Sequence, residues 1–526
     1  MDIFSVSFAL FFLTAYILYY TLMRRKQWVV LVVANLVFYA FSGWKNLIFI
    51  LITSFSVWGG ALAMERFALK AKERRKEPGL GKEEKDRIKA DTLRKKRLVL
   101  LAVLLLNFGI LAFFKYWNGV LKLLGLIFNT EVQNWTLFHG ASALLLPLGI
   151  SFYTFQSVGY CIDIYGGKYA AEKNPLKYLL FVSYFPALIQ GPINRYDSLA
   201  PQFQTTHRTG FSAMRRSLLL FAWGAVKKFA LANLLSGAVS LILDHVEPET
   251  PGCMIVTGIL LYGIQQYADF SGGIDMVLAL SDAFGIRMAE NFRQPYFSVS
   301  LGDFWRRWHI SLGAWMRDYV FYPFALTKLM QGLGKRVKKR FGPQAGSVIP
   351  ACVANILVFF IVGIWHGAQW HYIAWGLYNG LVIAAEDLVG MRFSFSGNSK
   401  GLRFFRMART FLIVNIGWYF DRILDVKCEF TALKNTLFSF QPSAFLPGIR
   451  ELYGSAFNEW TVCIAAVAFG MLLVTDIMKE CGKDVRTVIL ESNPAFRWAV
   501  YFLIFYLIQF GLIYGTATEG FMYAFF

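Results

Sequence analysis

The chain has 526 residues, of which 56% are hydrophobic and only 16% charged, and its mean hydropathy is +0.46. Soluble domains are about 45–50% apolar and about 25% charged. The composition therefore excludes an ordinary soluble enzyme, a disordered chain and a fibrous repeat. Long apolar runs recur along the sequence, so we expect an all-α polytopic membrane protein.

The formal net charge of +20 is concentrated in two short segments. Residues 66–97 hold 14 Lys or Arg and 6 Asp or Glu, and residues 331–340 hold five basic residues and no acidic one. Both segments lie between apolar runs, where the cytoplasmic loops of membrane proteins collect positive charge. We interpret the charge as a sign of orientation beside anionic lipid, and not as a sign of nucleic-acid binding.

The first apolar run, residues 6–23, is long enough to cross a bilayer and is followed by Arg24-Arg25-Lys26. It has no small-residue cleavage site, so we expect a retained span and no secretory signal. If the basic triplet is cytoplasmic, the N-terminus is outside, and the basic loop 66–97 is again cytoplasmic. The next three candidate spans are 28–42, 46–64 and 98–117.

Looser apolar runs follow, and some contain proline or lysine, namely Pro147, Pro186, Pro192, Lys227 and Lys228. Broken helices are tolerated at membrane depth where they are buried in protein or line a wet cavity. We therefore expect roughly eleven spanning helices with re-entrant and interfacial elements in the middle of the chain. These later candidates are 142–162, 176–193, 217–243, 253–268, 347–365, 370–388, 404–420, 456–478 and 495–515.

Two shorter segments have distinct patterns. Residues 303–324 interleave aromatic and charged side chains, which predicts an amphipathic helix at an interface. Ser271-Gly272-Gly273 is expected to form a turn beside Asp269, and not a phosphate-binding loop.

The six cysteines form no CxxC pair, so neither a disulfide framework nor a metal site is indicated.

Three of the six histidines lie in loop-like surroundings and are expected at the surface: His139, His207 and His245. His309, His366 and His371 instead lie among apolar residues. An ionisable group at membrane depth is costly and is a functional-site hypothesis by default. Each could equally be a packed imidazole bonded to a backbone carbonyl. No GxSxG, HExxH or GxxxxGK[ST] motif offers a competing chemistry.

Several ordered stretches between residues 147 and 367 resemble the membrane-bound O-acyltransferase family, in its bacterial cell-envelope branch. They are PLGISFYTFQ at 147–156, FP at 185–186 through QGPI at 190–193, YADFSG at 267–272, DFWRRWHISL at 303–312 and WHG at 365–367. This branch includes the alginate O-acetylation and teichoic-acid D-alanylation types of membrane protein. A lone WHG would be weak, whereas the ordered set is specific.

The resemblance implies helices around a central tunnel, through which an acyl group passes from a cytoplasmic donor to an extracellular hydroxyl. It also implies that His366 is catalytic and that His309 is the second catalytic histidine. On this basis His366 is expected to act as general base, with His309 or a tunnel donor stabilising the oxyanion. Four residues match motif positions and are expected to support either the tunnel or the structure of the motifs: Gln190, Asp303, Arg306 and Arg307.

The chain ends in FMYAFF, an F-x-Y-x-x-F pattern around Tyr523. It resembles an aromatic terminal motif of related acyltransferases, which implies an acyl relay through the Tyr523 hydroxyl. The alternative is an aromatic anchor at the membrane interface. An odd number of spans places this tail in the cytoplasm and an even number places it outside, so the side of the tail stays open.

The leading hypothesis is a plasma-membrane O-acyltransferase of a bacterium, with acetyl favoured over D-alanyl because the chain is long. One membrane domain is expected, with N-terminal spans at 1–117, a core at 142–388 and C-terminal spans at 389–526. No bound cofactor or metal is expected. The acyl donor is acetyl-CoA or a carrier-protein thioester, and the partners are an exported SGNH-type protein and an extracellular polymer. The alternatives of another class are a transporter and a non-enzymatic scaffold that docks an acidic carrier.

Overall fold

The computed structural model describes residues 3–41, 43–128, 147–367, 369–393, 399–515 and 520. These residues are predominantly helical, and the only extended pairings among them are two isolated bridges. The chain divides into two compact units. The first comprises residues 1–214 with 280–289, and the second comprises residues 215–279 with 290–526.

Six described helices are long and apolar enough to cross a membrane: Trp44–Arg74, Lys82–Trp117, Phe211–Leu243, Pro343–His366, Glu459–Glu480 and Pro494–Tyr514. Val6–Tyr20 and Gln27–Phe41 are shorter apolar helices. Three further helices exceed 20 residues but carry more polar sequences: Gly252–Ala283, Trp370–Arg392 and Lys400–Arg422. The expected all-α polytopic membrane class is confirmed.

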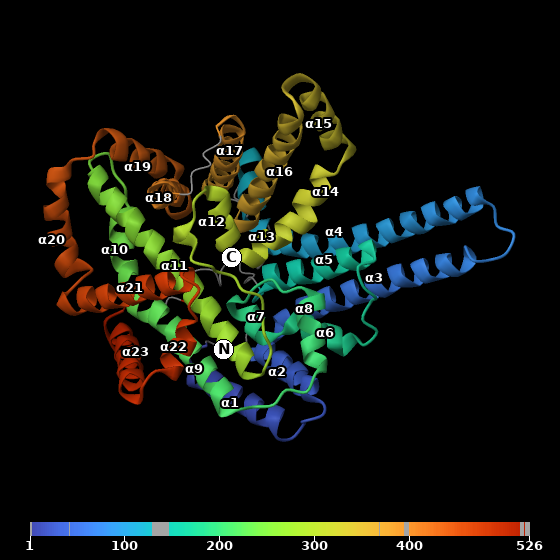
Figure 1. Cartoon of the computed structure of the whole chain (residues 1–526), viewed down its shortest axis with the longest axis horizontal. Helices are drawn as coiled ribbons and strands as arrows, with labels where there is room; N and C mark the ends of the chain where they lie inside the picture. Colours follow the sequence, from blue (N-terminus) through green and yellow to red (C-terminus); the bar gives the residue numbers. More distant parts are fainter. Residues whose placement is uncertain are drawn as a thin grey trace. The chain divides into compact units, whose positions relative to one another are not determined.

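The helices of the first unit follow one another in chain order from the blue to the green part of Figure 1. They are α1 (Val6–Tyr20), α2 (Gln27–Phe41), η1 (Trp44–Asn46), α3 (Leu47–Arg74), α4 (Lys82–Phe128), α5 (Ile150–Gly166), α6 (Pro175–Ser183), α7 (Phe185–Gln190) and α8 (Tyr196–Gln204).

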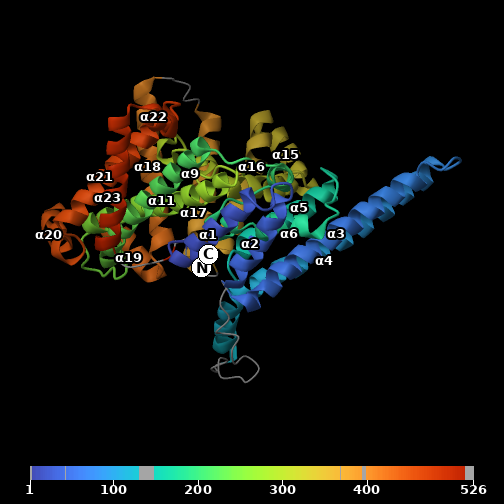
Figure 2. The same cartoon turned by 90° about the horizontal axis from the view of Figure 1, so that it is seen from below.

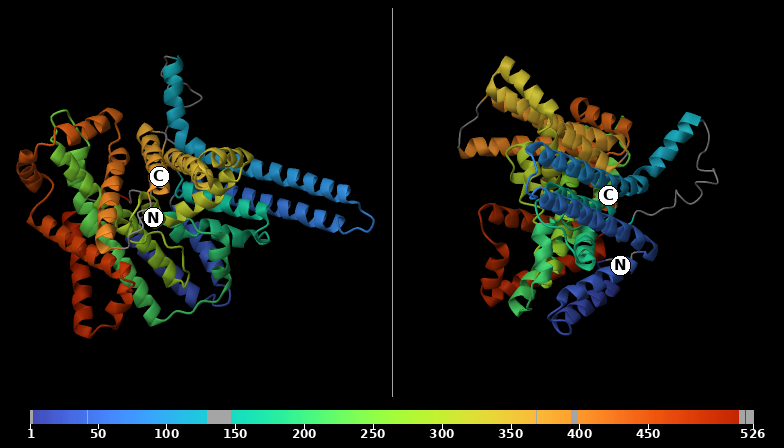
Figure 3. Two further views of the ribbon diagram at one scale, coloured as in Figure 1. Left: turned by 45° about the horizontal axis from the view of Figure 1, so that its top comes forward. Right: turned by 90° about the vertical axis from the view of Figure 1, so that its right-hand side faces the viewer.

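The charged segment 66–97, the expected connection between two spans, is a helical hairpin. Helices α3 and α4 continue through it and run side by side, as the long blue pair in Figures 1 and 3 shows, and only residues 75–81 form the turn. Lys, Arg and Glu are good helix formers, and pairs such as Asp91 and Lys95, 2.7 Å apart, support the exposed helix.

The run 176–193 is interrupted, as its prolines predict. Helix α6 ends at Ser183 and α7 begins at Phe185, with Pro186 in its first turn. Asn35 of α2 supports the break, because its side-chain carbonyl accepts from the Phe185 N–H (3.0 Å) and its amide donates to the Ser183 hydroxyl (3.3 Å). A buried polar side chain thus replaces a lost helical hydrogen bond.

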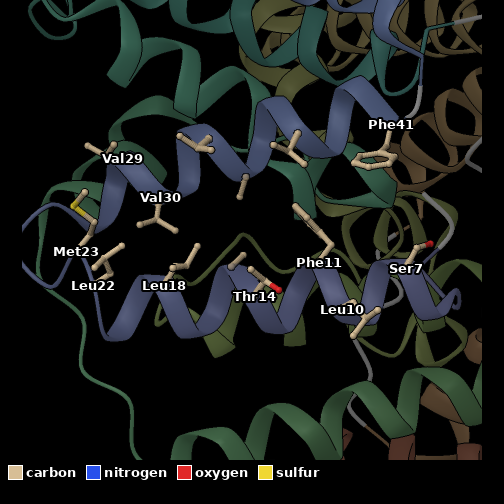
Figure 4. Close-up of a pocket in the computed structure, with 14 residues that line it drawn as sticks. Ser7, Leu10, Phe11, Thr14, Leu18, Leu22, Met23, Val29, Val30 and Phe41 are labelled. Carbon is tan, nitrogen blue, oxygen red and sulfur yellow. The ribbon is translucent and has the colours of Figure 1, made fainter.

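A groove of about 570 Å³ runs between α1 and α2 (Figure 4). Its walls are apolar apart from the hydroxyls of Ser7 and Thr14, and none of the 14 residues that line it is titratable. The groove lining therefore offers no acid, base or nucleophile stronger than a hydroxyl.

The second unit contains the remaining helices. They are α9 (Phe211–Ala225, which begins in the first unit), η5 (Val226–Ala232), α10 (Asn233–Leu243), α11 (Gly252–Ala283), η6 (Pro295–Phe297), α12 (Leu301–Arg307), α13 (Ile310–Met316), η7 (Arg317–Phe321), α14 (Tyr322–Ala325), α15 (Lys328–Phe341), α16 (Pro343–His366), α17 (Trp370–Arg392), α18 (Lys400–Arg422), α19 (Val426–Phe438), η8 (Pro442–Ala444), α20 (Phe445–Ser455), α21 (Glu459–Glu480), α22 (Val485–Glu491) and α23 (Pro494–Tyr514). In Figures 1 and 2 the red helices α21 and α23 lie beside the green helix formed by α9, η5 and α10.

Helix α11 continues through Ser271-Gly272-Gly273, so our expectation of a turn there is wrong. The glycines serve helix packing. A Cβ on Gly224 of α9 would lie 2.5 Å from the Gly272 carbonyl oxygen, and a Cβ on Gly272 would lie 2.8 Å from the Gly224 oxygen. The two helices approach so closely because both positions lack a side chain.

The segment 303–324 is also not one amphipathic helix. It is divided into α12, α13, the π-helical turn η7 and α14, and the chain leaves the helical conformation at Trp308 and His309. His309 has φ 46° and ψ 52°, which is left-handed and uncommon for a residue with a side chain. The segment is helical on each side of this break. The conformation of His309 at the break sets the direction of its imidazole.

Candidate functional site

His309 lies at a sharp corner between α12 and α13, and a neighbouring strand-like segment fixes that corner. Residues 291–293 run antiparallel to residues 307–310: the Ile310 N–H donates to the Asn291 carbonyl (3.0 Å), and the Arg293 N–H donates to the Arg307 carbonyl (2.9 Å). Backbone strain of this kind persists only where the surroundings over-determine it, and it clusters at functional sites.

The Asn291 side chain determines which nitrogen of His309 carries the proton. Its Oδ1 accepts from the Ser311 backbone N–H (3.0 Å) and the Ser311 hydroxyl (2.8 Å), and it lies 3.2 Å from His309 Nδ1. A backbone N–H can only donate, so this Asn291 atom is an oxygen. His309 Nδ1 must then donate its proton, and Nε2 is the basic nitrogen of the neutral ring.

Burial keeps the His309 ring neutral. Its side chain is 3% exposed, and desolvation lowers its pKa from 6.5 to about 3. The ring also meets Phe270 edge-on, with 5.0 Å between the two centroids. A neutral imidazole with Nε2 unprotonated is a hydrogen-bond acceptor at physiological pH.

His366 is the last residue of α16 and is 5% exposed. Helix α17 returns directly against this end because small residues face each other. A Cβ on Gly363 would lie 2.5 Å from the Tyr372 carbonyl oxygen, and a Cβ on Gly376 would collide with the Phe359 carbonyl. The glycines beside His366 therefore admit another helix, as close backbone approach requires.

Aromatic rings connect the two histidines. The Trp365 ring lies 6.5 Å from the His309 ring and 4.9 Å from the His366 ring, measured between centroids. Trp375 of α17 lies edge-on to His366 at 5.1 Å, and Trp305 of α12 lies edge-on to Trp375 at 5.3 Å. The second unit thus brings both predicted histidines to one aromatic-lined site.

The Trp375 indole N–H is a further polar group in this wall. Its side chain is 2% exposed, and the N–H has no hydrogen-bond acceptor among the described residues. An indole nitrogen can only donate, and a buried donor without an acceptor is costly. A buried indole N–H without an acceptor among the described residues therefore belongs to a ring that contacts His366.

The charged motif residues of α12 form ion pairs that hold the helix in place. Asp303 accepts from the Val299 N–H (3.2 Å) and lies 3.3 Å from Arg307. Arg307 also pairs with Glu480 of α21 at 2.9 Å, whereas Arg306 is largely exposed and lies 3.7 Å from Asp303. These contacts connect α12 to α21, and a supporting role for Asp303, Arg306 and Arg307 stays a prediction.

Gln190 belongs to the first unit. Its side chain is completely buried, and neither amide atom has a hydrogen-bond partner among the described residues. A buried amide in this state carries a desolvation cost that a ligand or water would relieve. Its supporting role stays a prediction.

The other histidines divide as follows. His371 is a packed structural residue, because its Nδ1 lies 3.0 Å from the Phe420 carbonyl and its Nε2 lies 2.8 Å from Gln369 Oε1. His245 is exposed and His207 is half-buried. His139 and the proposed relay residue Tyr523 lie outside the described residues.

Sequence reasoning missed Asn291 and Trp375. Asn291 lies 18 positions before His309 in an unremarkable run, and only the folded pairing brings it under the imidazole. Trp375 is one of 15 tryptophans, so its identity alone carries no distinguishing information. Within the part of the chain that the structure describes, no group of three or more His, Cys, Asp or Glu could hold a metal ion, and all six cysteines are free thiols.

The fold and the site define a multi-pass helical membrane protein with two buried histidines at an aromatic site. A family model described as membrane-bound O-acyltransferase matches residues 171–420, a range that includes both histidines. The chain is 34% identical over 484 residues to a probable alginate O-acetylase of Pseudomonas syringae pv. tomato, covering 89% of this chain and 82% of that protein.

Two more distant relatives are named for other functions. A peptidoglycan O-acetyltransferase of Helicobacter pylori is 28% identical, with 74% of this chain and 75% of that protein covered. A teichoic acid D-alanyltransferase of Bacillus subtilis is also 28% identical, with 53% and 70% covered. The chain belongs to the membrane-bound O-acyltransferase family and is an acyltransferase.

Proposed function

We propose that this chain transfers an acetyl group from a cytoplasmic thioester to hydroxyl groups of an exported polysaccharide or cell-wall polymer in a bacterial plasma membrane. The observation that carries the proposal is the pair of buried histidines on either side of Trp365. The similarity to an alginate O-acetylase and a peptidoglycan O-acetyltransferase supports acetyl as the group and a polymer as the acceptor.

In the proposed reaction His366 accepts the proton of the acceptor hydroxyl as its oxygen attacks the thioester carbonyl. A C–O bond forms, and a tetrahedral oxyanion results. Collapse of this intermediate breaks the C–S bond, and the leaving thiolate takes the proton from the imidazolium. The products are an ester and a thiol, and no external oxidant or reductant enters.

The geometry changes the role we propose for His309. A donor to the oxyanion needs an N–H aimed at it, but the His309 Nδ1 proton is directed at Asn291. Because the attacking hydroxyl gives its one proton to His366, we propose that His309 Nε2 accepts a hydrogen bond from a second hydroxyl of the polymer and positions it. The Trp375 N–H, beside His366 and without an acceptor among the described residues, is proposed as the oxyanion donor.

The basic helix α15 supports a cytoplasmic donor. Its charged side chains are all exposed, namely Lys328, Lys335, Arg336, Lys338, Lys339 and Arg340, and α15 packs against the first turns of α16. His366 ends α16, about 35 Å along the helix from its start. If α15 is cytoplasmic, His366 is near the opposite face, where the acceptor polymer and an exported SGNH-type partner are located.

The donor is acetyl-CoA or the thioester of an acidic carrier protein. Either would be steered towards α15 by its positive charge, which also suits anionic lipid. We keep the relay through Tyr523 as a proposal, and Tyr523→Phe tests it. This change removes the hydroxyl and retains the aromatic ring, so unchanged polymer acylation would exclude the relay.

D-alanyl transfer to teichoic acid is the second candidate, favoured by the similarity to the Bacillus subtilis D-alanyltransferase. Mass spectrometry of envelope polymers from a deletion strain and its complemented parent separates the two. Loss of base-labile acetyl on deletion, restored by complementation, supports the first proposal. Loss of D-alanine esters with acetyl unchanged would replace it with the second, and no change in either would refute both.

A further inference from the structure

Two adjacent lysines are buried inside the helix Phe211–Leu243. Lys227 and Lys228 lie in the π-helical turn η5 and are 4% and 3% exposed. Each ammonium pairs with a different carboxylate of α11: Lys227 Nζ lies 2.7 Å from Asp275, and Lys228 Nζ lies 2.6 Å from Asp269. Buried ion pairs are poor evidence for stability, and π turns are frequent at functional sites.

The two lysines differ in their other contacts. Lys227 Nζ donates to the Ser271 hydroxyl of α11 at 2.9 Å. Lys228 Nζ instead donates to the backbone carbonyl of Gly520 at 3.1 Å. Gly520 lies beyond α23, six residues from the last residue of the chain. The ammonium that pairs with Asp269 therefore also binds the chain at Gly520, as an ammonium with three protons can bind two acceptors.

The same π turn also seats the end of α23. A Cβ on Gly511 would lie 2.7 Å from the Phe229 carbonyl carbon and 2.8 Å from the Ala230 nitrogen, so α23 crosses η5 in backbone contact. A Cβ on Gly515 would lie 3.4 Å from the Asn233 side chain. The chain is thus held against this turn both before and at Gly520.

The partner of Lys228 is next to a residue that touches His309. Asp269 is followed directly by Phe270, whose ring meets the His309 imidazole edge-on at 5.0 Å between centroids. The residue after that, Ser271, binds Lys227. One turn of α11 therefore connects the point where the C-terminal segment is bound with the wall of the histidine site.

We propose that the Lys228–Asp269 pair is an anchor that holds the chain at Gly520 next to Phe270, the α11 residue that contacts His309, and that acyl transfer depends on this anchoring. Lys228 is a positioning residue: it acts through the segment that it holds and not on the reacting atoms. The activity part of this inference rests on the proposed function, whereas the anchoring part does not.

The test compares two charge-neutral double variants. Lys228→Met with Asp269→Asn removes the anchor, and Lys227→Met with Asp275→Asn removes the adjacent pair without touching Gly520. Because each removes one buried cation and one buried anion, neither leaves a lone charge. The first measurement is deuterium uptake by the peptide that covers residues 512–526 in the full-length protein in detergent.

The proposal predicts faster deuterium uptake in the Lys228 variant and parental uptake in the Lys227 variant. Acyl transfer in membranes is expected to fall about tenfold or more in turnover, with the donor KM within about twofold, only in the Lys228 variant. Equal deuterium uptake by this peptide in the parent and in both double variants would overturn the proposed anchor. Complete exchange of the peptide in the parent would overturn it as well.

If deuterium uptake rises in the Lys228 variant while its turnover is unchanged, acyl transfer does not depend on the anchor. A parent that transfers no acyl group at all refutes the proposed function, while the deuterium measurement still decides the anchor. An equal loss of turnover in both variants contradicts a role specific to Lys228.

Discussion

At the scale of single residues, one amide orients the buried imidazole of His309. The backbone N–H of Ser311 identifies Asn291 Oδ1 as an acceptor, and this acceptor in turn requires the proton on His309 Nδ1. The left-handed backbone of His309 makes the contact reachable. Asn291 and Ser311 therefore determine that Nε2 is the basic nitrogen of His309, although no sequence motif connects Asn291 with His309.

Burial of neutral His309 predicts a pH-dependent contribution to stability. Its folded pKa is lowered to about 3, so its contribution is complete above the unfolded value of 6.5 and decreases as pH falls towards 3. Relative to His309→Gln, the parent should lose on the order of 2 kcal/mol between pH 7 and pH 5. Thermal unfolding in detergent at both pH values measures this, and a Tm difference independent of pH would contradict it.

The proposed oxyanion donor gives a second prediction at this scale. Trp375→Phe keeps an aromatic ring against His366 and removes only the N–H. Turnover should fall about 100-fold, the range for loss of one oxyanion donor, while the KM for the donor and the Tm change little. Steady-state kinetics with membranes measure the first two. Parental turnover would assign the oxyanion to another donor.

At the scale of helices, close packing of α16 and α17 positions His366. Gly376→Ala adds a Cβ that collides with the Phe359 carbonyl, so we expect a loss of about 1–3 kcal/mol and a lower Tm. Gly390→Ala in the same helix meets nothing within 4 Å and should be neutral or slightly stabilising. Equal Tm values for the two variants would show that α16 and α17 do not pack as described.

The lengths of the apolar runs and the positions of proline predicted much of the fold, and the exceptions have physical causes. Hydropathy located the long apolar helices, and proline located the break between α6 and α7. The turn expected at Gly272 is absent because Gly224 packs against it. The single helix expected over 303–324 fails at His309, where tertiary hydrogen bonds override helical preference.

Sequence reasoning predicted the two histidines of the site, but not the residues that contact them. Motif resemblance identified His309 and His366, and the structure brings both against Trp365. The partners Asn291 and Trp375 come from distant positions that only the folded chain brings together. Their side chains have no pattern that distinguishes them from other asparagines or tryptophans.

At the scale of the whole molecule, composition and charge define a membrane protein and suggest its orientation. The apolar content sets the class, and the basic residues are concentrated in the α3–α4 hairpin and in α15. An acyltransferase, a transporter and a carrier-docking scaffold could all share these features. They differ in whether a buried base is required for polymer modification.

The most direct measurement is polymer acylation in a deletion strain that expresses His366→Ala. The account predicts loss of acyl esters by about 100-fold or more, because a general base contributes that much, with membrane level and Tm close to the parent. His371→Ala is a second buried-histidine variant whose expected defect is in stability, since its imidazole bonds Phe420 and Gln369. Parental acylation by folded His366→Ala would contradict the central claim.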